Sequence, residues 1–199
     1  MDLAELKKRY EQGSEDHKLA LIQRAEKGQN PTSFWMACMD SGNSPNTLLK
    51  YVPGEIFVHR TPGGFIPPYS DTSEVADMLE TAFSVAVASG TTSYNILPHT
   101  QCGAAKALSD GKPSSSLYLS LAKDAVKDAV TIAGTTDADA LSAEIERQFA
   151  ISSLKNIREY PSLKDGLETG RFTANAFLHN IAERKLMRVD PDTYELKEL

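Results

Sequence analysis

Short apolar runs alternate with helical patterns along most of the chain. The apolar run at 34–38 and the partly apolar segments at 55–59 and 94–97 are four or five residues long, and Gly, Pro, Ser, Asn or Thr residues lie close to their ends. Nearly continuous apolar runs of this length are typical of strands that are buried on both faces, as in parallel sheets. We therefore expect three short parallel strands in the first half of the chain.

Helical periodicity fills the segments between and after these runs. Apolar residues recur at intervals of three or four over 73–87, 116–132 and 137–156, and Ser73 is a good N-cap for the first of these helices. Two further strands are expected at 172–179 and 185–189. The alternation of strands and helices predicts an α/β fold.

The N-terminal segment has a different character. Residues 3–27 are charged and weakly amphipathic and end at Gly28, which predicts one helix that is exposed or packs weakly. We expect residues 1–27 to form a helical arm and residues 28–199 to form one α/β domain.

Composition excludes several classes of partner. The chain has 199 residues, is 41% hydrophobic and has a formal net charge of −6. Without basic runs, this charge argues against a nucleic-acid or anionic-membrane partner. No apolar stretch approaches the roughly 20 residues of a membrane span, and the N-terminus lacks an apolar signal core. Two cysteines do not form a disulfide framework, so we expect a reducing compartment, the cytoplasm.

Both cysteines lie where predicted strands end. Cys38 ends the first apolar run, and Asp40 follows two residues later; His99 and Cys102 follow the third run. The carboxyl ends of parallel strands meet at one edge of a sheet, so these residues are expected to converge. Two thiolates, one imidazole and a carboxylate or water make the tetrahedral set that Zn²⁺ prefers. The sequence therefore predicts a zinc site.

The motifs around these ligands resemble those of the β-class carbonic anhydrases. Cys-x-Asp-Ser is followed some sixty residues later by His-x-x-Cys-Gly, and the resemblance covers roughly residues 28–190. The other matching segments are Pro-Gly-Glu-Ile-Phe-Val-His-Arg at 53–60, Ile-Pro-Pro-Tyr at 66–69, the helix at 153–161 and the ending at 181–189. The resemblance implies a mainly parallel sheet of four to five strands flanked by helices. It also implies dimers or larger homo-oligomers in which the N-terminal helices wrap the partner.

The resemblance also implies a function. Cys38, His99 and Cys102 match the three protein zinc ligands of a lyase that reversibly hydrates CO₂ to bicarbonate through zinc-bound hydroxide. Asp40 matches the aspartate that accepts a hydrogen bond from zinc-bound water in the open state and becomes the fourth ligand in a closed state. Gln29 matches a glutamine that reaches the substrate pocket across the dimer.

Three more residues match positions with assigned roles. Phe57 matches an apolar wall residue of the substrate pocket. Trp35 and Arg60 match two residues that line a regulatory bicarbonate pocket in some bacterial members. The third segment of that pocket carries a tyrosine in those members but reads Phe177-Leu178-His179 here.

One departure bears directly on activity. The family motif is Cys-x-Asp-Ser-Arg, and Gly42 stands where the arginine belongs. That arginine pairs with the aspartate and holds it away from the metal. Without it, Asp40 is an unpaired carboxylate beside a dication, which favours direct coordination and a closed site. Pocket positions such as Pro62, Gly63 and Ala104 also differ from the family pattern.

Three hypotheses are compatible with these residues. The first is a carbonic anhydrase of reduced or altered activity. The second is a zinc hydrolase for another small electrophile, such as COS or CS₂. The third is a catalytically silent homologue with a closed Cys₂HisAsp site, in which zinc is structural.

Overall fold

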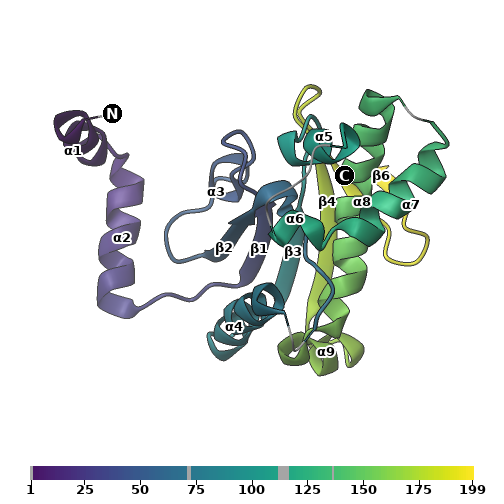
Figure 1. The fold of residues 1–199 in the computed structure, drawn as a ribbon. Helices are drawn as coiled ribbons and strands as arrows, with labels where there is room; N and C mark the ends of the chain where they lie inside the picture. The colour runs from purple at the N-terminus through teal and green to yellow at the C-terminus, as the bar shows by residue number, and fades with distance from the viewer. Residues whose placement is uncertain (1, 71–72, 112–116, 136) are drawn as a thin grey trace.

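In the computed structural model, which describes residues 2–70, 73–111, 117–135 and 137–199, a twisted sheet forms the centre of the molecule (Figure 1). Its strands have the order β2-β1-β3-β4-β5-β6; β2, β1, β3 and β4 are parallel, and β5 and β6 are antiparallel additions. The strands are β1 (Ser33–Cys38), β2 (Ile56–Thr61), β3 (Ser93–Leu97), β4 (Thr173–Asn180), β5 (Lys185–Val189) and β6 (Leu196–Glu198). The predicted α/β class and mainly parallel sheet are confirmed.

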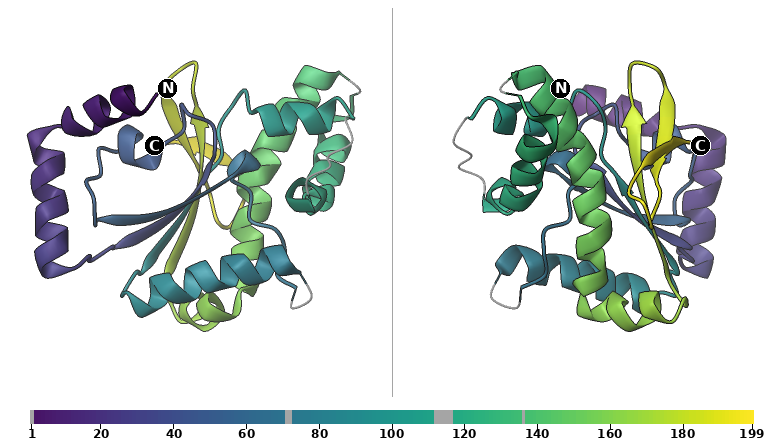
Figure 2. Two further views of the ribbon diagram at one scale, coloured as in Figure 1. Left: turned by 60° about the vertical axis from the view of Figure 1, so that its left-hand side comes forward. Right: turned by 90° about the vertical axis from the view of Figure 1, so that its right-hand side faces the viewer.

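Helices lie around this sheet and extend beyond it. They are α1 (Leu3–Glu11), α2 (Glu15–Lys27), α3 (Pro45–Leu48), α4 (Glu74–Ala88), α5 (Gly103–Ser109), α6 (Leu117–Ser120), α7 (Lys123–Ala133), α8 (Ala138–Asn156) and α9 (Pro161–Glu168), with 3₁₀ turns η1 (Pro62–Gly64) and η2 (Ile157–Glu159). Both views in Figure 2 show α8 running alongside the sheet, with α4 and α9 across its lower end.

Strand β1 lies in the middle of the parallel part and is buried throughout. Because side chains alternate along a strand, Phe34 and Met36 face a large core built with α4, α8 and α9. Trp35 and Ala37 face the opposite side, in a smaller cluster with Leu97. Burial on both faces explains the continuous apolar run in the sequence.

One helix start follows the predicted capping chemistry, and a second uses a cap of the same kind. The Ser73 side chain accepts from the backbone N–H of Ala76 and begins α4. The Asp137 carboxylate accepts from the N–H of Ala140 and begins α8. A side-chain oxygen at this position satisfies a backbone donor that has no partner inside the helix.

Two expectations about secondary structure were wrong in detail, and one strand was not expected. The single helix expected over 3–27 is divided, because Ser14 follows Gly13 and caps a new helix, α2. The helix expected over 116–132 starts at Ser116, outside the described residues, and the described part of this segment forms two helices, α6 and α7. They separate at a turn that buries Ala122 against the core around Cys38. The strand β6 was not predicted, because three residues give no periodic signal.

The N-terminal arm, α1 and α2, has no buried residue in this chain. Figures 1 and 2 show it standing away from the sheet, to which it is joined through residues 28–32. Several large apolar side chains on it are exposed, among them Leu19 and Ile22, each 54% exposed. Among the described residues, no helix combines the length and apolar character needed to cross a membrane.

Gly64, in η1, packs directly against the backbone of the first ligand strand. Its φ is +62°, and a Cβ there would lie 2.6 Å from the Cys38 nitrogen. We expect Gly64→Ala to lower the free energy of unfolding by about 3 kcal/mol, from left-handed strain and overpacking together. Gly134→Ala is the control, because its φ is +57° with no atom within 4 Å of a Cβ. Urea unfolding should show a loss of only about 1 kcal/mol for this variant; equal losses would contradict the packing argument.

Candidate metal centre

Neighbouring parallel strands bring the three predicted metal ligands together. Cys38 is the last residue of β1, and His99 follows β3, whose Leu97 is paired with Ala37. Cys102 is the N-cap residue of α5. The ligand atoms of Cys38, His99 and Cys102 all lie within 4.8 Å of one another, and all three residues are buried. The strand ends meet as expected for a parallel sheet.

The two thiols share one environment. Their sulfur atoms are 3.9 Å apart. The hydrogen bond from Cys102, aided by the neighbouring His99, lowers the pKa of Cys38 to about 4 against the opposing effect of burial. The same interaction raises the pKa of Cys102, because a second thiolate would lie beside the first. The shared hydrogen bond therefore favours one thiolate in the pair, and a bound cation would require both thiols in that form.

The imidazole of His99 also points to a metal. Its Nδ1 lies 2.8 Å from the carbonyl oxygen of Thr100, which fixes the ring with Nδ1 as the donor. Its Nε2 is buried and has no hydrogen-bond partner among the described residues. A buried nitrogen with a free lone pair beside two thiols fits a Cys₂His zinc site. Cys38, His99 and Cys102 would hold the ion.

Asp40 lies close to this group but outside it. Its side chain is exposed, and its Oδ1 accepts a hydrogen bond of 2.8 Å from the backbone N–H of Gly42. Gly42, at the position of the missing arginine, thus gives the carboxylate a neutral backbone donor. Among the described residues, no Lys, Arg or His side chain forms an ion pair with Asp40.

The two residues expected at a regulatory anion pocket are occupied by other contacts. The Arg60 guanidinium donates to the carbonyl oxygen of Cys38, at 3.0 and 3.2 Å, and to that of Asp40. Trp35 is buried, stacks on Phe177 at 5.9 Å and donates its Nε1–H to Ser33. In this chain, Arg60 therefore braces the loop after Cys38, and Trp35 belongs to the core.

The two residues expected at a substrate pocket lie near the other end of the sheet. Gln29 is exposed and precedes β1 by four residues. Phe57 is paired with Phe34, close to the amino end of β1, and packs on the main core. Neither is near the metal ligands of its own chain.

The structure adds two residues that the sequence did not indicate. Asn43 is fully buried; its Nδ2 donates to the carbonyl oxygen of Leu97, and its Oδ1 lies 3.0 Å from Nδ1 of His179. Glu146, on α8, is 4% exposed and accepts the backbone N–H of Cys102 at 2.8 Å. Burial raises the pKa of Glu146, and backbone donors at Cys102 and Gln101 oppose this effect. One sequence feature could have indicated Glu146: this charged residue directly follows Ile145, which belongs to the apolar face of the helix predicted over 137–156.

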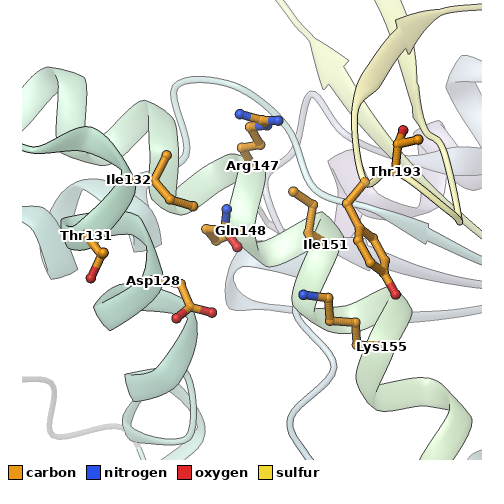
Figure 3. Close-up of a pocket in the computed structure, with 9 residues that line it drawn as sticks. Asp128, Thr131, Ile132, Arg147, Gln148, Ile151, Lys155 and Thr193 are labelled. Carbon is orange, nitrogen blue, oxygen red and sulfur yellow. The ribbon is translucent and has the colours of Figure 1, made fainter.

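Two hollows border α8. One, of about 520 Å³, is lined by Thr100, Gln101 and Glu146 beside the metal ligands, together with Lys106, Asp139, Ser142 and Ala143. The other, of about 260 Å³, lies between α7, α8 and the turn after β5; Figure 3 shows Arg147, Ile151 and Lys155 along its α8 wall. Its lining contains no metal ligand and none of the predicted site residues.

Comparison with known proteins agrees with this geometry. The chain is 28% identical over 168 residues to a carbonic anhydrase of Pseudomonas aeruginosa, covering 81% of this chain and 74% of that protein. It is 24% identical to a carbonic anhydrase of a Synechocystis strain, covering 85% of this chain and 64%, just under two thirds, of that protein.

Solved structures share the fold. The β-carbonic anhydrase CcaA matches with a TM-score of 0.84 over 99% of this chain and 98% of its own, at 20% identity. A structure described under tetrameric β-carbonic anhydrases from Sordaria macrospora matches with a TM-score of 0.69 over 87% of this chain and 92% of its own, at 16% identity. The sequence profile of the carbonic anhydrase family matches residues 33–186. The chain, with its Cys-His-Cys group at the ends of parallel strands, therefore belongs to the carbonic anhydrase family and has the β-class fold.

Proposed function

We propose that the protein is a zinc-dependent lyase that interconverts CO₂ and bicarbonate. The observation that carries this proposal is the buried group of Cys38, His99 and Cys102, in a chain of the carbonic anhydrase family. Zinc, when bound, supplies a Lewis acid that activates water for attack on a small electrophile. Cys38, His99 and Cys102 would hold the ion in place.

We propose further that the activity is low. The Asp40 carboxylate has a backbone amide as its donor, and an arginine would add a second, cationic donor. A hydrogen bond to a charged group contributes about 1.5–3 kcal/mol, which corresponds to about 10- to 150-fold in rate if it is made in the transition state. A weakly held Asp40 also favours coordination as a fourth ligand, which is the basis of the silent alternative.

Metal analysis with stopped-flow CO₂ hydration tests this function. Protein purified without chelator is expected to contain about one zinc per chain, the number that one Cys₂His site holds. It should hydrate CO₂ above the uncatalysed rate but about 10- to 150-fold below an arginine-containing β-class enzyme assayed beside it. COS and CS₂, tested in parallel, should be turned over no faster than CO₂.

Three outcomes would change the assignment. Absence of zinc would remove the basis of the proposal. Zinc without hydration between pH 6 and 9 would support the silent homologue with Asp40 on the metal. Faster turnover of COS or CS₂ would support the hydrolase alternative.

We propose that the substrate pocket is completed by a second copy of the chain. Gln29 lies before the amino end of β1, with its Cβ 4.0 Å from the place of a Cβ at Gly54, just before β2. Phe57 pairs with Phe34, four residues or about 13 Å along the strand from Cys38. Neither can line the metal site of its own chain in this fold. A two-fold partner can bring both residues to the site.

The N-terminal arm supports the same assembly. It exposes apolar side chains and buries none within its own chain, so a partner is needed to cover it. We propose a homodimer, or a tetramer built from such dimers. The two free, metal-binding thiols suit a reducing compartment, which is why we propose a cytoplasmic location.

Ile22→Asp tests the role of the arm. A charge at an apolar contact loses burial and adds a desolvation cost, so the dimer dissociation constant should rise at least about 30-fold. Gln23→Asp is the matched control, because it adds the same charge to the neighbouring exposed position of α2. Light scattering across a concentration series should show monomer for the first variant only. An unchanged dimer in both would show that the arm is not the contact.

A further inference from the structure

The loop that carries two of the metal ligands is conformationally constrained. Between His99 and Cys102, Gln101 has a φ of +60°, a left-handed conformation that costs a residue with a Cβ about 1–2 kcal/mol. The other side of the loop is tied to β4, since the Thr100 N–H donates to the carbonyl oxygen of His179. Such a loop needs contacts that hold it in place.

Cys102 needs a partner for its backbone N–H. As the N-cap residue of α5, it lies before the helical ladder, so its N–H has no acceptor within that helix. The acceptor is Oε1 of Glu146 at 2.8 Å, in a buried contact between segments 44 residues apart. Among the described residues, no lysine or arginine lies within ion-pair distance of Glu146. Burying a carboxylate without a cation beside it costs folding free energy. The hydrogen bond to the Cys102 N–H offsets part of this cost, which gives the contact a structural purpose.

The same helix also contacts the other half of the metal centre. Phe149, three residues after Glu146, packs so closely on η1 that a Cβ at Gly63 would lie 2.5 Å from its ring. Gly64, which follows Gly63 in η1, packs on the backbone of Cys38, where a Cβ at Gly64 would lie 2.6 Å from the Cys38 nitrogen. Helix α8 therefore contacts the Cys102 side directly and the Cys38 side through η1.

We propose that Glu146 is a positioning residue of the metal centre. It holds the Cys102 amide from α8 and so fixes the distance between the Cys102 sulfur and the Cys38 sulfur before a metal binds. This inference rests on the proposed function only in assuming that the site binds zinc. In this role the residue acts through the backbone of a ligand.

Zinc affinity, measured by competition with a chromophoric chelator, tests this role. Glu146→Ala removes the acceptor, and zinc affinity should fall about 10- to 100-fold, as is usual for partners that orient metal ligands. Glu146→Gln keeps an oxygen at the same reach and should restore affinity to within about 3-fold of the original protein. Glu144→Ala is the matched control, since Glu144 lies on the same helix and contacts Gln148 instead of the ligand loop; its affinity should be unchanged.

The absorption spectrum of the Co²⁺-substituted protein gives a second readout. Glu146→Ala should alter the cobalt–thiolate bands, whereas Glu144→Ala should leave them as in the original protein. Unchanged affinity and spectrum in Glu146→Ala would overturn the inference, as would an equal loss in Glu144→Ala. Failure of the original protein to bind zinc would instead refute the proposed function.

Discussion

Replacing Cys102 with serine is expected to abolish zinc binding at physiological concentrations and CO₂ hydration with it. A structural Cys/His zinc site contributes about 10–16 kcal/mol of apparent binding free energy, so one thiolate of three protein ligands accounts for about 4 kcal/mol. That loss corresponds to about a thousandfold lower affinity. A serine hydroxyl is too weakly acidic to replace the thiolate as a ligand at neutral pH. Chelator competition and metal analysis of the purified variant measure the effect.

A control must separate ligand loss from damage to the fold. Thr61 is paired with Cys38 in the sheet and is 6% exposed, and its hydroxyl donates to the sulfur of Met36. Thr61→Val removes this buried hydroxyl but no ligand, so the variant should keep about one zinc per chain while losing some stability. If Cys102→Ser retained zinc with unchanged affinity, Cys102 would not be a ligand.

The sequence predicted the metal group because its geometry follows from topology. Cys38 and His99 come directly after apolar runs, and parallel strands place such positions at one edge of the sheet. The packing of Phe34 and Met36 on one face and Trp35 on the other follows from the same runs. Local sequence patterns and a general rule of sheet topology were sufficient to predict the metal ligands and the two buried faces of β1.

The rest depends on contacts between distant segments. The proposed role of Glu146 depends on α8 packing against the Cys102 loop, although the two residues are 44 positions apart in the sequence. The hydrophobic periodicity of a helix does not predict such a contact. The reach of Arg60 to the carbonyl oxygens of Cys38 and Asp40 likewise depends on the path of the loop between them. The break between α1 and α2 lies at Gly13-Ser14, a helix-end residue followed by an N-cap residue. The similar charged pattern on both sides of this pair obscures the break in the sequence.

Restoring the motif arginine should raise activity. We expect Gly42→Arg to increase kcat/KM for CO₂ hydration about 10- to 150-fold, because the new guanidinium can pair with Asp40 and hold it in its hydrogen-bonding role. The backbone tolerates the change, since Gly42 is not among the residues with positive φ. A Cβ there would lie 3.2 Å from Oδ1 of Asp40, so the carboxylate must move by a few tenths of an ångström. Stopped-flow hydration at equal zinc content measures the gain.

The charge, and not the size, of the new side chain should produce this gain. Gly42→Gln adds a side chain of similar reach and leaves the Gly42 N–H in place, but it supplies only a neutral donor. It should therefore raise kcat/KM less than Gly42→Arg does, because a guanidinium brings its own charge and two parallel donors to the carboxylate. Equal gains in both variants would attribute the effect to filling space beside Asp40. No gain in Gly42→Arg at full zinc content would mean that the missing arginine does not limit CO₂ hydration by this chain.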